Sequence, residues 1–135
     1  MIKILLVTSE KESFSEFARL LKEKDDVALT WAASGQEALK AISDNPVDLA
    51  VVNENIGDMT GIEFLKKLLQ TNPMINSAAI SQLTSEEFHE ASEGLGVLVQ
   101  LPVDPGELEA EDLLKRLKHL KDLTAGINIG MNSNE

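Results

Sequence analysis

The stretch Leu49-Ala50-Val51-Val52-Asn53 decides the fold, because four apolar residues end abruptly at a polar amide. The N-terminal run, residues 2–7, ends in the same way at Thr8 and Ser9. Near-continuous apolar runs of this length are typical of parallel strands that are buried on both faces. The carboxyl ends of such strands meet in the crevice where open α/β folds bind ligands. The sequence therefore predicts that Thr8, Ser9 and Asn53 share one crevice.

Apolar runs alternate with segments of helical spacing along the whole chain. The runs are residues 2–7, 27–30, 49–52, 78–80 and 97–99. Regular alternation with short loops gives a parallel sheet covered by helices on both faces, with right-handed crossovers. We therefore predict an α/β fold: a single doubly wound, five-stranded parallel sheet of flavodoxin-like order 2-1-3-4-5, with five helices. The first and third strands are neighbours in that order, so the crevice lies between them.

Helix starts are marked by a cap residue that is followed three positions later by Glu. Such pairs are Ser9/Glu12, Ser34/Glu37, Thr60/Glu63, Thr84/Glu87 and Asp104/Glu107. Each cap stabilises its helix by about 1 kcal/mol. Ser9 therefore has two interpretations, as a helix cap and as part of the crevice.

Composition limits the classes of function. The chain has 135 residues, enough for one core, and its 43% hydrophobic content argues against disorder. Its net charge of −11 disfavours nucleic acid and anionic membrane as partners. It has no cysteine, which excludes disulfides, thiol catalysis and thiolate metal sites. No apolar stretch approaches the roughly 18 residues of a membrane helix, so we expect a cytoplasmic protein.

Short motifs stand in a fixed order at the ends of the apolar runs. Residues 46–53 lead to Asn53, Ser81 follows the fourth run, and Leu101-Pro102 follows the fifth. In this order and spacing they resemble the receiver domain of two-component response regulators (CheY-like), over roughly residues 2–122. The resemblance implies a phosphorelay signalling module, with Asn53 at the position of the phosphoacceptor aspartate and Ser81 at the hydroxyl switch position.

The C-terminal part of the chain separates into two regions. We place a receiver-like domain at residues 1–123, because the last helical pattern carries acids early and basic residues late, which suits the helix dipole. From residue 124 onward the sequence shows no period. We therefore expect residues 124–135 to form a flexible tail or the start of a linker.

The departures from the family pattern remove its chemistry. The family carries carboxylates at the positions of Thr8, Ser9 and Asn53, where they hold magnesium and accept phosphate. Magnesium prefers hard anionic oxygens, and an amide cannot form an acyl phosphate. Leu101 replaces the lysine that would neutralise phosphoryl charge, and only Ser81 keeps its expected chemistry. We expect a degenerate phosphorylation pocket of these five residues, with no catalytic residue, cofactor or metal.

Four residues form the candidate partner surface. Trp31 follows the run expected at one edge of the sheet, either as a plug of the core or as a partner anchor. Leu98 stands at the family's aromatic switch position, and Val99 and Pro102 flank Leu101 near the opposite edge. Leu101 and its neighbours either fill the vacated pocket or form a docking patch.

The predicted function is a pseudo-receiver that works without phosphorylation, by binding a protein partner or by self-association. The resemblance implies a homodimer through the last two helices and the strand at residues 97–99, without nucleic acid or membrane. Two alternatives stay open. The first is an atypical phosphoacceptor at Asp58 or Ser81, and the second is a small-ligand sensor in the neutral pocket. Glu10, Glu54 and Asp58 could also hold a cation weakly.

Overall fold

A sheet of five parallel strands forms the centre of the computed structural model, which describes the backbone of residues 1–133 and the side chains of residues 1–120. The strand order is β2-β1-β3-β4-β5. The strands are β1 (Ile2–Val7), β2 (Val27–Ala32), β3 (Leu49–Val52), β4 (Asn76–Ile80) and β5 (Val97–Leu101). This confirms the predicted fold class and order, although β2, β4 and β5 are each longer than the sequence analysis predicts.

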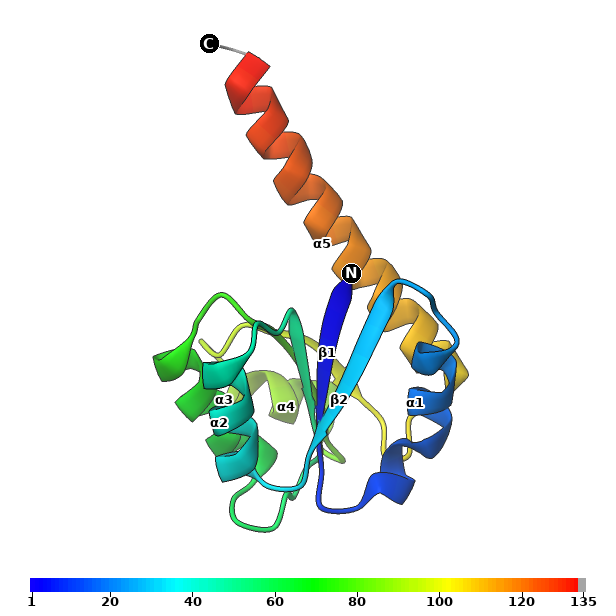
Figure 1. Ribbon diagram of the computed structural model, residues 1–135. Helices are drawn as coiled ribbons and strands as arrows, with labels where there is room; N and C mark the ends of the chain where they lie inside the picture. Colours follow the sequence, from blue (N-terminus) through cyan, green and yellow to red (C-terminus); the bar gives the residue numbers. More distant parts are fainter. Residues whose placement is uncertain (134–135) are drawn as a thin grey trace.

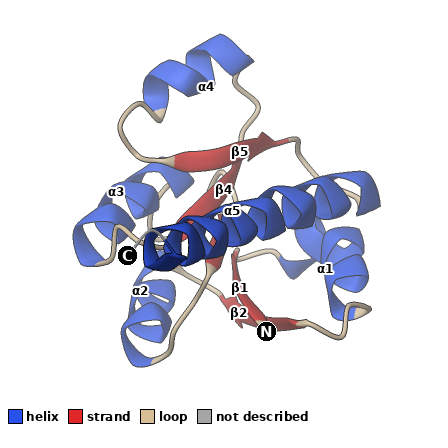
Figure 2. Ribbon diagram, turned by 90° about the horizontal axis from the view of Figure 1, so that it is seen from above, coloured by secondary structure: helices blue, strands red, loops and turns tan. Residues whose placement is uncertain are grey.

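Helices cover both faces of the sheet. The 3₁₀ helix η1 (Lys11–Phe14) leads into α1 (Ser15–Lys22); the others are α2 (Gly35–Asp44), α3 (Gly61–Thr71), α4 (Ser85–Ala91) and α5 (Glu107–Ser133). Figure 2 shows α1 on one side of the sheet, α2 and α3 on the other, and α4 beyond β5. The helix α5 shares a hydrophobic cluster with α1. Within the described residues, the five predicted α-helices are therefore present.

Two hydrophobic clusters hold the layers together, and the strands divide their side chains between them. Because side chains alternate across a strand, β1 gives Ile4 and Leu6 to the cluster under α1 and α5, and Leu5 and Val7 to the cluster under α2 and α3. Each of these four side chains is at most 1% exposed. The near-continuous apolar character of the strand thus follows from burial on both faces.

Three of the predicted caps are confirmed. Thr60 and Thr84 form complete capping boxes, in which the threonine oxygen accepts from the third helical amide and the Glu carboxylate accepts from the cap amide. The Ser34 hydroxyl accepts a bond of 3.1 Å from the amide of Glu37. These bonds satisfy amides that have no partner inside the helix.

The predicted caps at Ser9 and Asp104 are wrong. After β1 the chain enters η1, whose N-terminus carries no side-chain cap. Asp104 has a φ of 52°, which lies in the left-handed region and does not match the extended conformation of a cap. Instead, the amide of Gly106 donates to the carboxylate of Glu109 at 2.7 Å, just before α5 begins.

The helix α5 continues through most of the stretch that we expect to form a tail. Its bounds are Glu107–Ser133, and Figure 1 shows it extending past the end of the sheet. Residues 134 and 135, and all side chains after Leu120, lie outside the described residues. The boundary at residue 123 and the flexibility of the tail therefore stay predictions.

The capping box of α4 gives a test of the fold. The Thr84 hydroxyl accepts from the amide of Glu87 at 3.1 Å. We expect Thr84→Ala to lower the free energy of unfolding by about 1 kcal/mol in urea titrations. The control is Thr71→Ala, because that hydroxyl, among the residues that the structure describes, bonds only to the Lys67 carbonyl of its own helix. Equal losses in the two variants would contradict the assigned cap.

Candidate functional site

The first residues of the predicted crevice, Thr8 and Asn53, directly follow β1 and β3 at the carboxyl ends of these strands. The amide of Thr8 donates to the Ala32 carbonyl, and the amide of Asn53 donates to the Val7 carbonyl, both at 3.0 Å. These bonds extend the sheet by one residue and fix both backbones. The Nδ2 of Asn53 then donates to Oγ1 of Thr8 at 2.9 Å. The structure thus brings Thr8 and Asn53 into direct contact across the neighbouring strands.

The Thr8 hydroxyl has no remaining hydrogen-bonding capacity. It accepts from Asn53 and from the amide of Glu10 at 3.0 Å, and it donates to the Glu10 carbonyl at 3.1 Å. A hydroxyl has one donor and two acceptor lone pairs, so these three bonds use all of them. The residue is only 2% exposed. Its oxygen is therefore committed to hydrogen bonds within the protein.

The amide of Asn53 is engaged at both ends. Its Oδ1 accepts from the amide of Glu54 at 2.8 Å, while its nitrogen binds Thr8. The backbone of α3 also approaches closely here, because a Cβ at Gly61 would lie 2.5 Å from the Asn53 carbonyl oxygen. Ser9, by contrast, is exposed at the entrance to η1.

Ser81 and Leu101 lie on the other side of β3, at the ends of β4 and β5. The Ser81 amide donates to the Leu101 carbonyl at 3.1 Å, and its Oγ accepts from the amide of Leu83 at 3.1 Å. The serine hydroxyl therefore closes the first turn of the β4–α4 loop. The Leu101 side chain is 3% exposed and belongs to the cluster under α1 and α5. This burial favours the core-filling interpretation of Leu101.

Two glutamines hold the β4–α4 loop in place. The carboxylate of Glu54 accepts from the amide of Gln82 at 2.8 Å and from its side chain at 3.1 Å. From β5, Nε2 of Gln100 donates to the carbonyls of Ser81 and Leu83, at 3.2 and 2.8 Å. The loop is thus tied to the loop after β3 and to β5. Neither glutamine was predicted from the sequence, where their only signal is a position beside a strand end.

Asp58 caps α2 and does not point its charge into the crevice. Its two oxygens accept from the amides of Gly35 and Gln36, at 2.8 and 3.1 Å. These backbone bonds hold the pKa of Asp58 below its usual range. The N-terminus of a helix favours such a carboxylate. Asp58 therefore joins the β3–α3 loop to α2.

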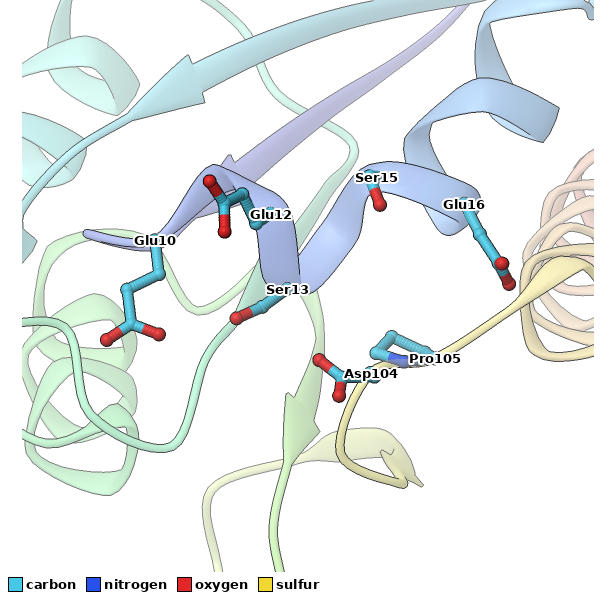
Figure 3. A pocket seen from close by; sticks show the side chains of 7 residues that line it. All are labelled: Glu10, Glu12, Ser13, Ser15, Glu16, Asp104 and Pro105. Atoms are coloured by element: carbon cyan, nitrogen blue, oxygen red, sulfur yellow. The ribbon is translucent and has the colours of Figure 1, made fainter.

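Acidic side chains near the crevice do not converge on one point. Among residues 1–120, no three of His, Asp or Glu are grouped closely enough to hold a metal ion. Glu10 instead lines a hollow of about 430 Å³ beside η1, together with Glu12, Glu16 and Asp104. Figure 3 shows their carboxylates spread along this hollow, with those of Glu10 and Glu16 far apart.

The candidate partner residues lie at opposite edges of the sheet. Trp31 is on β2 and half-buried, with its ring centroid 6.5 Å from that of Phe14 and the Lys11 Nζ 5.3 Å from its ring. Leu98 and Val99 on β5 are half-buried against the α1/α5 cluster, and Pro102 is exposed. Three strands separate β2 from β5, so these residues form two surfaces.

The chain is similar to receiver domains in sequence and in structure. Residues 4–111 match the model of the response regulator receiver domain. A two-component response regulator from Legionella pneumophila has a TM-score of 0.74 at 23% identity, covering 88% of this chain and 99% of that one. A chemotaxis response regulator of Vibrio cholerae has a TM-score of 0.73 at 24% identity, covering 87% of this chain and 98% of that one.

In the part of the chain that the structure describes, no helix has the length and apolar character needed to cross a membrane.

The contact between Asp58 and α2 predicts a pH-dependent variant. We expect Asp58→Asn to lower the urea midpoint at pH 7, because the amide loses the charge that strengthens both bonds. The folded-state pKa of Asp58 is lowered from 3.8. Its stabilisation is therefore present above the unfolded pKa and is lost as pH falls through the folded pKa.

Urea unfolding at several pH values from 7 down to 3 measures this effect. The difference in urea midpoint between the wild type and Asp58→Asn should shrink at the acidic end of the series. Asp25→Asn is the control, since that carboxylate is exposed and has no hydrogen bond to any described residue. A difference that stays constant from pH 7 to pH 3 would contradict the assigned role of Asp58.

Proposed function

Because the chain belongs to the response regulator receiver domain family, we propose that it is a pseudo-receiver of two-component signalling. It accepts no phosphoryl group, and it acts by binding a protein partner or a second copy of itself. The observation that carries this proposal is the bond from Asn53 to Thr8, which joins two positions where the family's chemistry needs carboxylates. We also propose that it acts in the cytoplasm.

The crevice lacks the groups that phosphoryl transfer requires. A phosphoacceptor needs a nucleophilic oxygen anion, whereas Asn53 offers a neutral amide whose atoms already bind Thr8 and Glu54. A transferred phosphoryl group also needs positive charge around its oxygens, and Leu101 is a buried apolar side chain. The saturated hydroxyl of Thr8 adds no ligand for magnesium.

The loops around the crevice are held by direct hydrogen bonds. Glu54 bonds to Gln82, and Gln100 bonds to two carbonyls of the β4–α4 loop. Such bonds support a single resting conformation that does not depend on a bound metal or phosphate. A partner would then recognise a surface that is always present. One such surface is the β5 edge with Leu98, Val99 and Pro102, next to α4 and α5, and it is also our proposed homodimer interface.

Mass spectrometry after treatment with acetyl phosphate and magnesium tests phosphate independence. We expect the wild-type mass to stay unchanged, because Asn53 offers no nucleophilic oxygen anion. A matched variant carries Thr8→Asp, Ser9→Asp, Asn53→Asp and Leu101→Lys, and we expect it to gain one phosphoryl group. Uptake of a phosphoryl group by the wild type would overturn the proposal.

Thermal unfolding with and without magnesium gives a second test. We expect the wild-type Tm to be insensitive to magnesium, since a ligand stabilises only the state that binds it. The variant Thr8→Asp, Ser9→Asp, Asn53→Asp should start at a lower Tm, because its carboxylates repel one another, and should rise with magnesium. A magnesium-dependent rise in the wild type would contradict a metal-free crevice.

Amide NMR with magnesium and beryllium trifluoride, a phosphoryl mimic, extends this test to single residues. We expect the signals of Asn53, Ser81 and Leu101 to stay in place. Saturable shifts at these positions would show that the crevice still binds an anion–metal pair, and would reopen the assignment of Asn53 as inert.

A further inference from the structure

The outer edge of β2 is open to a further strand. Among the described residues, β2 is the terminal strand of the sheet and pairs only with β1. The carbonyl of Ala32 faces β1, because it accepts from the amide of Thr8, the residue after β1, at 3.0 Å. The N–H and C=O groups of successive residues alternate between the two sides of a strand. Trp31 and Leu29 lie one and three residues before Ala32, so their N–H and C=O groups point to the open edge.

This edge lacks the usual protection against pairing. Natural edge strands are often blocked by charged residues, proline or a bulge. β2 (Val27–Ala32) contains no charged residue, no proline and no glycine, and its register with β1 is unbroken over six residue pairs. In Figure 1 it lies at the front of the molecule, with α1 on one side and α2 on the other. All residues of β2 before Ala32 are half-buried or exposed, so a partner can reach this edge.

A hollow lies on each face of β2, beside the open edge. The hollow on the α1 side measures about 380 Å³ and has an apolar floor that includes Trp31 and Ala18. The hollow on the α2 side measures about 320 Å³, and it is lined by Ala28 and Thr30 of β2 and by Val47. A strand added to an edge directs alternate side chains to opposite faces. The two hollows lie where these side chains would project.

The α1-side hollow has a basic rim on a strongly acidic protein. Lys11, Arg19 and Lys22 line it, together with Glu12, whereas the whole chain has a net charge of −11. Arg19 forms an exposed ion pair with Glu107, and within residues 1–120 Lys11 and Lys22 form none. A second copy at this edge would bring the same cations together, which is unfavourable. An acidic segment would be complementary.

We propose that the β2 edge binds an extended acidic segment of a partner protein as a sixth strand, with its alternate side chains in the two hollows. In this mode of recognition, main-chain bonds give affinity and the side-chain pockets give specificity. The inference rests on the proposed function only in treating the chain as a protein-binding module. It does not depend on whether the crevice accepts phosphate.

A titration with a defined peptide tests this proposal. The probe is a nine-residue peptide, acetylated and amidated, in which glutamate and valine alternate. Trp31 is the only tryptophan and the chain has no tyrosine, so its emission reports on the β2 edge, where Trp31 lines both hollows. We expect saturable changes in this emission and in the NMR signals of the β2 amides. A peptide with lysine in place of glutamate should bind at least tenfold more weakly.

Two pairs of variants separate backbone pairing from charge. Leu29→Pro removes an N–H group that points outward, where an edge strand tolerates proline, and Leu29→Ala removes the same side chain but keeps the N–H. We expect at least tenfold weaker binding to the proline variant than to the alanine variant. Lys11→Glu with Lys22→Glu should weaken binding to a similar extent, whereas Lys66→Glu with Lys67→Glu on α3 should not. If Leu29→Pro does not fold, the proposal is tested by comparing peptide affinity between the two double lysine variants.

Three results would overturn the inference. The first is the absence of saturable change at millimolar peptide, and the second is equal affinity for the lysine peptide. The third is self-association of the wild type that Leu29→Pro abolishes, because the edge would then belong to a second copy. The titration contains no magnesium or phosphodonor, so its failure would leave the pseudo-receiver proposal intact. Conversely, phosphoryl uptake by the wild type would refute the pseudo-receiver without affecting the peptide result.

Discussion

The hydroxyl of Thr8 imposes the constraint on which the crevice depends. A polar group that is almost fully buried must form hydrogen bonds, because leaving it unpaired costs roughly 1–3 kcal/mol. Thr8 meets this requirement with one contact to Asn53 and two to the backbone of Glu10. The same bonds fix the turn that leaves β1 and the residue that follows β3. Two neighbouring strand ends are therefore joined by a neutral contact.

The carboxylates that remain around the crevice also form hydrogen bonds within the chain. Glu54 and Asp58 each accept two bonds from N–H groups of other loops or helix ends. Both therefore act as connectors between the loop after β3 and its surroundings. The crevice keeps the architecture of a receiver, but the bonds that organise it are internal to the chain.

Much of the fold could be predicted from the sequence, because the relevant signals are local. Runs of apolar residues locate all five strands, and Thr60 and Thr84 mark helix starts through neighbours only three positions away. The strand ends were harder to predict, since Ser77 and Gln100 are polar residues inside strands. The caps at Ser9 and Asp104 failed because the backbone at these places turns before the helix begins.

The candidate site was less predictable, because its contacts join distant parts of the chain. Residue types alone indicated that Thr8 and Asn53 lack the chemistry of carboxylates. The bonds of Glu54 to Gln82 and of Asp58 to α2 span 28 and up to 23 residues, and no local pattern marks them. The separation of Trp31 from Leu98 and Val99 also follows from strand order, which places their strands at opposite edges.

The neutral bond between Asn53 and Thr8 has a consequence for signalling over time. A phosphorylated receiver stores information in a labile bond, and the lifetime of that bond sets how long a signal lasts. If this chain accepts no phosphoryl group, as we propose, it has no such labile bond. The strength of its signal would then depend on its concentration. Synthesis, degradation and competition among its partners would control that signal.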